Sequence, residues 1–357
     1  MTRYLLVTND FPPRFGGIES FNQWVADELS GEVTVVTRQD PGWEVYDSRL
    51  PFPVRRLPGP LLPGRPLRRA VHEAIDDSAP ETIIFGAVAP LAALSPELRR
   101  GSVRRIVGLT HGHEVTWARS AAPLLSRWFA GLDAVSYISD YTRYFLAPLV
   151  GDSKLVRITP PVDMSVFRPA EQPVTDPICI AAARFTRQKG IHVLLRAWPQ
   201  VLKSIPEARL RLIGAGAYEP TLRKIVGSMP DSSSIEWVGP MPRERVPAEL
   251  QAARVFALPV QSRWRGLYAE GLGLAAAEAA ACGLPVVVGD SGGAPETVVD
   301  GGSGSVVSDA NQTAAALTQL LASPELSERM GRAGIEHVRA RYSSEIQRRG
   351  LRVLLEG

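Results

Sequence analysis

Two cationic side chains follow a short apolar run in the second half of the chain. Residues 178–183 have the pattern of a buried strand, and Arg184 and Lys189 come directly after it, ahead of an amphipathic helical stretch at 192–203. Two cations beside a helix N-terminus can neutralise the negative charges of a diphosphate. A solvated basic loop would have the same composition, so the pair alone leaves both interpretations open.

Two acidic residues flank an alanine-rich stretch further along. Residues 274–281 have the composition of a buried helix, Glu278 is placed about two turns into it, and Glu270 stands at its mouth. A buried carboxylate needs hydrogen-bond donors, which the hydroxyls of a sugar or a ribose would supply. A helical rise of about 1.5 Å per residue separates the two acids by about 12 Å. That spacing is too large for the paired carboxylates of a glycosidase, and it suits the two ends of one extended ligand.

Two histidines follow a predicted strand of the first half. Thr-His-Gly-His-Glu at 110–114 comes after the apolar run 105–109 and places His111 and His113 at a strand end. A histidine there can hydrogen-bond a substrate hydroxyl, and we favour that role for His111. The run His-x-His-Glu would also allow a metal site, but no third ligand at a suitable spacing supports it, so a metal centre is disfavoured.

Two glycine pairs are further candidates. Gly16 and Gly17 follow the turn after the first strand and open a helical stretch, where their backbone can approach an anion. Gly-Gly-Ala-Pro-Glu at 292–296 is a second glycine turn after a strand. A glycine turn without any ligand would explain Gly16 and Gly17 equally well. The fingerprint Gly-x-Gly-x-x-Gly follows the first strand of neither half, which argues against nicotinamide dinucleotide chemistry.

The elements that must position these residues alternate between strand and helix. The predicted strands are 4–8, 33–36, 82–85, 105–109 and 134–138 in the first half, and 178–183, 209–213, 234–238, 255–258 and 285–288 in the second. This rhythm predicts parallel sheets with right-handed crossovers, and a proline-rich linker at 160–170 separates the two series. We therefore expect an α/β protein of two doubly wound, Rossmann-like domains that face each other across a cleft, with ligands at the carboxyl ends of the strands.

The composition excludes several classes of protein. With 357 residues, 45% of them hydrophobic and 22% charged, the chain has enough apolar material for two packed domains. It contains no apolar run of transmembrane length. The apolar run near its N-terminus is too short for the hydrophobic region of a signal peptide. Cys179 and Cys282 are too far apart to suggest a disulfide framework or a zinc site. Forty basic residues against 37 acidic ones give no dense basic face for nucleic acid.

Arginine is nevertheless concentrated in one segment. Nine arginines lie between Arg55 and Arg105, against five acidic residues. The segment is either a solvated surface or a patch that meets an anionic partner such as lipid headgroups.

In their order along the chain, these motifs resemble the retaining glycosyltransferases of family 4. The resemblance rests on residues 9–13 with Gly16-Gly17, on 110–114, on Arg184 with Lys189-Gly190, on Glu270 with Glu278, and on 292–296. It covers nearly the whole chain and implies the two-domain GT-B fold. One departure is local: Tyr268 stands where the family pattern has an acid, and the run 264–266 before it is unusual. Both departures lie near the sugar end of the expected site and therefore concern the identity of the donor sugar and of the acceptor.

The resemblance also implies roles for single residues. Gly16 and Gly17 would touch the diphosphate region of a nucleotide-sugar donor, and Arg184 and Lys189 would neutralise the diphosphate. Glu270 would contact the transferred sugar, Glu278 the ribose, and His111 the sugar or the charge that develops on it. Val238, Leu272 and Gly273 complete the predicted donor site.

The resemblance within family 4 is to mannosyltransferases of phosphatidylinositol mannoside synthesis. It implies transfer of a hexose, mannose from GDP-mannose, to a phosphatidylinositol mannoside lipid in α-1,6 linkage, without a metal or other cofactor. Two alternatives remain: a transferase of secondary metabolism that uses another nucleotide sugar and a small natural product, and a non-catalytic nucleotide-sugar-binding protein.

The same resemblance and the pattern of strands and helices predict the domain organisation. We expect an acceptor-binding domain at 1–165, a nucleotide-sugar-binding domain at 166–340, and a C-terminal helix at 341–357 that packs back on the first domain. We further expect a cytoplasmic protein with peripheral contact at the inner face of the cell membrane.

Overall fold

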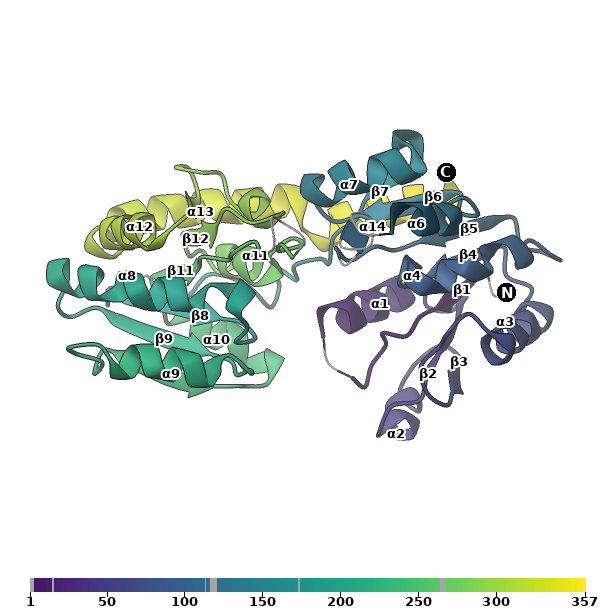
Figure 1. Cartoon of the computed structure of the whole chain (residues 1–357), viewed down its shortest axis with the longest axis horizontal. Helices are drawn as coiled ribbons and strands as arrows, with labels where there is room; N and C mark the ends of the chain where they lie inside the picture. The colour runs from purple at the N-terminus through teal and green to yellow at the C-terminus, as the bar shows by residue number, and fades with distance from the viewer. Residues whose placement is uncertain (1–2, 15, 113, 116–120, 173, 264–267) are drawn as a thin grey trace. The chain divides into compact units, whose positions relative to one another are not determined.

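The computed structural model divides the chain into two compact units (Figure 1). It describes all residues except 1–2, 15, 113, 116–120, 173 and 264–267. The first unit comprises Met1–Pro161 and Gln347–Gly357, and the second comprises Val162–Ile346. The boundary thus falls between Pro161 and Val162, where the sequence suggested 165/166, and the end of the chain returns to the first unit.

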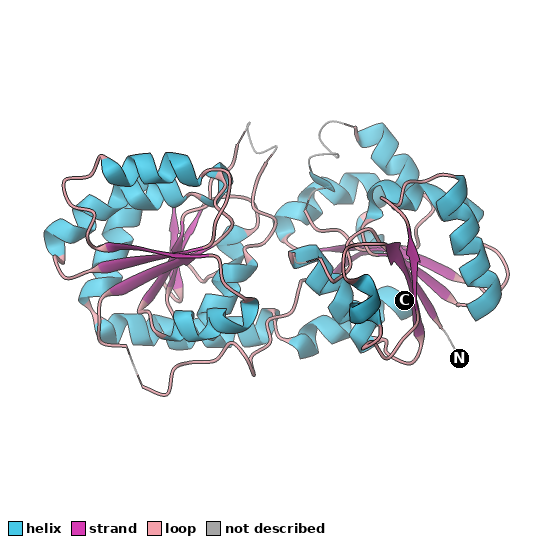
Figure 2. Ribbon diagram, turned by 90° about the horizontal axis from the view of Figure 1, so that it is seen from below, coloured by secondary structure: helices cyan, strands magenta, loops and turns pink. Residues whose placement is uncertain are grey.

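The first unit is built on a seven-stranded parallel sheet. Its strand order is β3 (Val54–Leu57), β2 (Val33–Arg38), β1 (Tyr4–Val7), β4 (Thr82–Phe85), β5 (Arg105–Gly108), β6 (Ala134–Tyr137) and β7 (Leu155–Arg157). β1 and β4 are completely buried, because helices cover both faces of the sheet (Figure 2). Buried strands of this kind consist of continuous apolar runs, which is why the sequence identifies them readily.

Alternate residues of β1 belong to two separate cores, one on each face. Leu5 and Val7 pack with α3 (Arg65–Ser78), α6 (Ala122–Phe129) and α7 (Asp140–Val150). Tyr4 and Leu6 pack with α1 (Gly17–Glu28) and with α14 (Ser344–Glu356), whose leucines complete that core. Two short helices, α2 (Trp43–Asp47) and α4 (Val88–Leu91), follow β2 and β4.

The second unit repeats the plan with six parallel strands. Their order is β10 (Ile235–Gly239), β9 (Arg209–Ile213), β8 (Ile178–Ala182), β11 (Val255–Leu258), β12 (Val286–Gly289) and β13 (Gly304–Val307). Its helices are α8 (Ile191–Ser204), α9 (Glu219–Gly227), α10 (Val246–Gln251), α11 (Leu274–Ala281), α12 (Ala310–Ala322) and α13 (Pro324–Arg341). α8 packs against α12, and α11 packs against α13. The buried indole of Trp198 in α8 donates a hydrogen bond to Ser234 Oγ over 2.9 Å.

The prediction of two doubly wound α/β units is confirmed, and so are the ten strands that the sequence identified, each within two residues of the observed ends. The prediction missed β3, β7 and β13, which are short and only partly buried and so lack an apolar run. One geometric expectation is wrong. α11 begins at Leu274, so Glu278 lies only about one turn into it, and the calculated separation of the two acids does not apply. Among the described residues, no helix combines the length and apolarity needed to cross a bilayer.

Candidate functional site

The loops at the carboxyl ends of β8, β11 and β12 carry most of the predicted donor residues. β8 and β11 are neighbours in the sheet although the chain order reverses between them. Loops on the two sides of such a reversal diverge and leave room for a ligand. Arg184 and Lys189 follow β8, Glu270 follows β11, and 292–296 follow β12. This edge of the second sheet is the candidate donor site.

Lys189 and Glu270 form an ion pair in this site. Lys189 Nζ lies 2.8 Å from Glu270 Oε2, and the two side chains are 27% and 13% exposed. Gly293 N–H donates a hydrogen bond to the Glu270 carbonyl over 2.8 Å, which anchors the backbone of the acid. An ion pair that is largely shielded from water interacts more strongly than one at an open surface. The sequence predicted the two residues for different parts of a ligand, and the structure shows that they contact each other.

Two glycines allow the loops of the site to touch through their backbones. Gly190 has a φ of +71°, and a Cβ added to it would lie 1.8 Å from the carbonyl oxygen of Pro259. Gly292 has a φ of +59°, and its added Cβ would lie 2.1 Å from the carbonyl oxygen of Glu270. No other residue type fits these positions without moving the backbone. The loops after β8, β11 and β12 are therefore interlocked.

Arg184 differs from Lys189 in its surroundings. It is exposed, and its guanidinium forms no ion pair with any residue that the structure describes. Its charge is therefore available to an incoming anion.

Glu278 is the most buried acid of the site. Only 5% of the residue is exposed, and its carboxylate is paired with Arg243, which comes from the short helical turn after β10. Burial raises the pKa of the Glu278 carboxyl, and the Arg243 guanidinium opposes that rise. The same guanidinium lies over the ring of Phe167, 5.4 Å from its centroid. A buried acid in need of a partner was predicted, but the partner found here is a cation of the chain itself.

The other predicted donor residues lie in the same unit. Leu272 is buried, and Gly273 is the N-cap residue of α11 with a φ of +94°. Val238 is half-buried near the end of β10, where the pairing with β9 shifts register. Tyr268 is described and 46% exposed, whereas the unusual run 264–266 lies outside the described residues.

His111 lies at the carboxyl edge of the first sheet. Its Nε2 is 2.6 Å from the carbonyl oxygen of Gly86. A carbonyl only accepts hydrogen bonds, so Nε2 carries the hydrogen in this contact. The backbone N–H of His111 donates to the carboxylate of Glu114, a residue that is 4% exposed, over 3.0 Å. The histidine is thus held at both its ring and its backbone. His113 lies outside the described residues.

Gly16 and Gly17 begin α1 at the same edge of the first sheet. Gly16 is the N-cap residue, and a Cβ added to it would lie 2.1 Å from Glu19 Oε2. Arg14 neutralises that buried carboxylate through its Nε, 2.6 Å from Glu19 Oε1, and also contacts Asp10. The helix N-terminus that was expected to approach an anion therefore carries an acid of its own, with Arg14 as its counter-ion.

The sequence reasoning missed Arg243 in the candidate donor site of the second unit. It also missed Glu114 and Arg14, which lie beside the predicted residues of the first unit. Arg243 had a usable signal, because it is a cation after the carboxyl end of a predicted strand, as Arg184 is. Glu114 lay inside the motif quoted for His111 but received no role. Arg14 had no distinguishing pattern.

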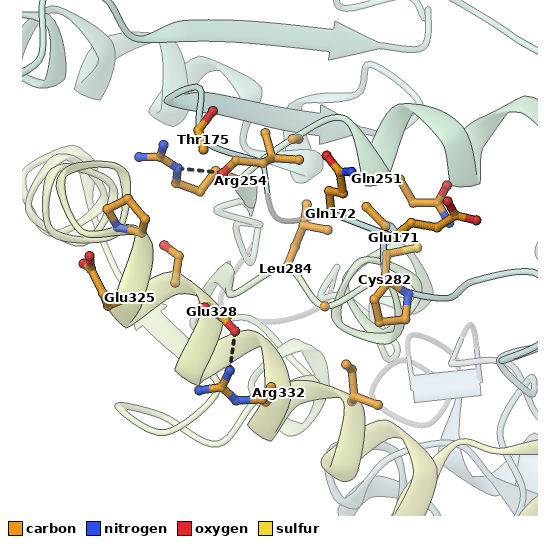
Figure 3. A pocket seen from close by; sticks show the side chains of 18 residues that line it. Glu171, Gln172, Thr175, Gln251, Arg254, Cys282, Leu284, Glu325, Glu328 and Arg332 are labelled. Atoms are coloured by element: carbon orange, nitrogen blue, oxygen red, sulfur yellow. Dashed lines mark hydrogen bonds and ion pairs between the residues drawn. The ribbon is translucent and has the colours of Figure 1, made fainter.

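The pocket of about 400 Å³ shown in Figure 3 lies elsewhere in the second unit. Its lining comes from the segments that lead into β8, β11 and β12 and from α13, so it opens at the amino ends of the strands. Cys282 lines it, and burial raises the pKa of that thiol to about 12, which keeps it protonated. In the described part of the chain, no three His, Cys, Asp or Glu side chains are grouped as metal ligands would be.

Most of the clustered arginines are paired. Six of the nine form ion pairs: Arg55 with Asp77, Arg56 with Asp47, Arg68 with Glu97, Arg69 with Glu73, Arg99 with Asp133 and Arg100 with Asp76. Arg105 donates to the carbonyl of Leu354 in α14. Only Arg65 and Arg104 make no ion pair or side-chain hydrogen bond with a described residue. The segment therefore has less free positive charge than its composition suggests.

The chain thus has two Rossmann-type units, with a charged site at the carboxyl edge of the second sheet, as the GT-B class of glycosyltransferases does. A family model described as glycosyl transferases group 1 matches residues 165–337. The chain is 39% identical, over 92% of each chain, to a GDP-mannose-dependent alpha-(1-6)-phosphatidylinositol monomannoside mannosyltransferase of Mycolicibacterium smegmatis. It is 34% identical to a GDP-mannose-dependent monoacylated alpha-(1-6)-phosphatidylinositol monomannoside mannosyltransferase of Corynebacterium glutamicum, over 99% of this chain and 97% of that one. The chain belongs to the group 1 glycosyltransferases, as the sequence motifs predicted.

Solved structures agree on the fold. Anabaena Alr3699/HepE in complex with UDP superimposes with a TM-score of 0.82 at 18% identity, over 99% of both chains. Sucrose-phosphate synthase from Thermosynechococcus elongatus has a TM-score of 0.77 at 21% identity, over 99% of this chain and 98% of that one.

Proposed function

We propose that this chain transfers mannose from GDP-mannose to a phosphatidylinositol monomannoside, in α-1,6 linkage and with retention at the anomeric carbon. The observation that carries the proposal is the 39% identity over 92% of both chains to an enzyme with that named activity. The second relative, from another genus, has the same donor and a monoacylated form of the same acceptor in its name.

The charges of the second unit support a diphosphate donor. Arg184 is exposed and has no ion-pair partner among the described residues, and Lys189 lies on the same loop. We assign both to the diphosphate, Glu270 to the transferred sugar and Glu278 to the ribose. We therefore propose that Arg184 and Lys189, rather than a metal ion, offset the charge of the leaving group.

The reaction step exchanges one bond at the anomeric carbon for another. The bond between that carbon and the diphosphate oxygen breaks, and the diphosphate keeps the electron pair. The acceptor hydroxyl forms the new bond on the face that the diphosphate leaves, and its proton passes to a diphosphate oxygen. Arg184 and Lys189 stabilise the charge that develops on the leaving group, and His111 is proposed to contact the sugar.

Transfer of labelled mannose from GDP-mannose to phosphatidylinositol monomannoside vesicles, in the presence of a chelator, tests the activity directly. A parallel measurement compares the thermal midpoint of the protein with GDP, UDP and ADP, because a ligand that binds only the folded state raises it. We expect GDP to give the largest rise. A clear preference for UDP would contradict GDP-mannose as the donor. The absence of a mannosylated lipid would contradict phosphatidylinositol monomannoside as the acceptor.

We further propose that the first unit contacts the bilayer that holds the acceptor. Leu62 is 62% exposed on the proline-rich loop between β3 and α3, and Asn9 fixes this loop through two hydrogen bonds to the backbone of Leu61, of 2.6 and 2.8 Å. Arg65 follows at the start of α3 and is exposed. An apolar side chain next to a free cation suits the interface of an anionic membrane.

Co-sedimentation with vesicles tests this contact. Leu62→Asp and Arg65→Glu should each reduce pelleting with phosphatidylinositol vesicles, because each basic residue near an anionic surface contributes about 1 kcal/mol. Val299→Asp is the matched control, since Val299 is 50% exposed in the second unit. Equal pelleting of all variants, or equal pelleting with neutral vesicles, would argue against this surface.

A further inference from the structure

We propose that Arg243 is a positioning residue for nucleotide binding: it keeps the Glu278 carboxylate charged and oriented to accept hydrogen bonds from the ribose. This inference rests on the proposed function, which assigns Glu278 to the ribose. Neither the sequence motifs nor the named activities of the relatives give Arg243 a role.

Glu278 is buried in an apolar environment. The residue is 5% exposed on α11, a helix that otherwise consists of alanine and leucine. An isolated carboxylate in such an environment takes up a proton. A protonated carboxyl has one oxygen occupied by hydrogen, so it accepts fewer hydrogen bonds from two neighbouring ribose hydroxyls than the ionised form does.

Arg243 is the cation on which the charge of the Glu278 carboxylate depends. Its Nη2 contacts Glu278 Oε1, and no other cationic side chain among the described residues is within ion-pair distance of that carboxylate. The two residues are 35 positions apart and come from different elements, the turn after β10 and α11. The contact is therefore a product of the fold and not of local sequence.

The other titratable groups around α11 do not replace Arg243. Cys282 is the C-cap residue of α11, and burial raises the pKa of its thiol to about 12, which keeps it neutral. Glu296, from the turn after β12, has its carboxylate 3.9 Å from Arg341. His337 of α13 contacts the carbonyl oxygen of Glu296 over 2.8 Å. β11 and β12, which also pack on α11, contain no titratable side chain.

Arg243 can hold the Glu278 carboxylate without filling the site. Its side chain is 54% exposed, and its guanidinium carbon rests over the ring of Phe167. A guanidinium has five N–H groups in one plane. One Nη makes the contact with Oε1, and the position of the guanidinium over Phe167 leaves the second carboxylate oxygen to a ligand.

The experiment measures GDP affinity by calorimetry as a function of pH, for the wild type and for Arg243→Gln. Removing an opposite charge that directly contacts a carboxylate raises the carboxyl pKa by about 1–3 units. Protonation of Glu278 therefore moves toward neutral pH in the variant. We expect the variant to bind within about threefold of the wild type near pH 9 and about tenfold or more weakly near pH 6. At each pH, the dissociation constant of the variant is divided by that of the wild type. The nucleotide phosphate, which titrates near pH 6, affects both constants equally and therefore cancels from this ratio.

Two controls separate charge from structure. Arg243→Lys keeps the charge and should follow the wild-type profile, and Arg245→Gln removes an exposed cation from the same turn and should not change it. A ratio for Arg243→Gln that is the same at every pH would overturn the proposal, since loss of packing alone has no pH dependence. Glu278→Gln tests the proposed function separately: if it binds GDP as the wild type does, the ribose assignment itself is wrong.

Discussion

Lys189→Met removes the cation of the Lys189–Glu270 ion pair and leaves the acid in place. The Glu270 side chain is 13% exposed, and the lost contact is 2.8 Å long. Breaking a fully buried pair costs about 3–5 kcal/mol, and the partial exposure of Lys189 reduces that to an expected loss of about 1–2 kcal/mol. For a unit of this size, about 2–4 °C of thermal midpoint corresponds to each kcal/mol.

The same substitution acts separately on the donor. If Lys189 binds the diphosphate, the variant loses a charge-assisted hydrogen bond of about 1.5–3 kcal/mol, which weakens donor binding by about tenfold or more. The double variant Lys189→Met/Glu270→Gln distinguishes the two effects. It removes the unpaired acid, so the thermal midpoint should return toward that of the wild type while GDP affinity stays low.

Calorimetry with GDP and thermal unfolding of the free protein are the two assays. Recovery of GDP affinity together with stability in the double variant would refute a diphosphate-binding role for Lys189, because Lys189 would then serve only to neutralise Glu270. GDP binding by Lys189→Met as tight as that of the wild type would refute the same role.

Five further substitutions, at four residues, test the remaining assignments. Arg184→Ala should weaken GDP binding by about tenfold without lowering the thermal midpoint, because no described residue depends on its charge; unchanged GDP affinity would place the phosphates elsewhere. Glu270→Ala should reduce turnover more than the affinity for free GDP, and Glu278→Ala should do the reverse; calorimetry and initial rates on both variants would reveal the opposite pattern if the roles were exchanged. Glu114→Ala should lower the turnover number through the orientation of His111 while leaving GDP affinity unchanged, and Glu114→Gln, which keeps an acceptor for the His111 N–H, should recover much of the rate; equal loss in both variants would count against positioning through this hydrogen bond.

The sequence predicted those parts of the fold in which burial leaves a continuous apolar run. β1, β4 and β11 are buried at every residue, and such strands can be recognised one at a time. β3 contains Arg55 and Arg56 and is half-buried at every position, so nothing in its composition distinguishes it from a loop. Edge strands of this kind are defined by the neighbour with which they pair.

The candidate site was predictable as far as residue types after strand ends could show. Arg184 and Lys189 were identified in this way, whereas Glu270 and Glu278 were identified as acids spaced along an alanine-rich helical stretch. The structure places all four in the second unit. Their partners could not be identified, because the contacts of Lys189 with Glu270 and of Arg243 with Glu278 span 81 and 35 residues. An ion pair of that sequence separation depends on the order of the strands, which the rhythm of strand and helix alone does not specify.

The return of the chain to the first unit makes the second unit an insertion in the topological sense. Its two ends lie side by side, since Val162 N–H donates to the carbonyl of Tyr342 over 2.8 Å and Val162 pairs with Ser343. Residues 162–346 can therefore be exchanged as one cassette for the matching segment of a relative, with the two junctions made at neighbouring points. By contrast, a single cut at Pro161 would leave the first unit without Leu351, Leu354 and Leu355 of its core. In an exchange of cassettes, the preference for the nucleotide should travel with the insert and the preference for the acceptor should stay with the host.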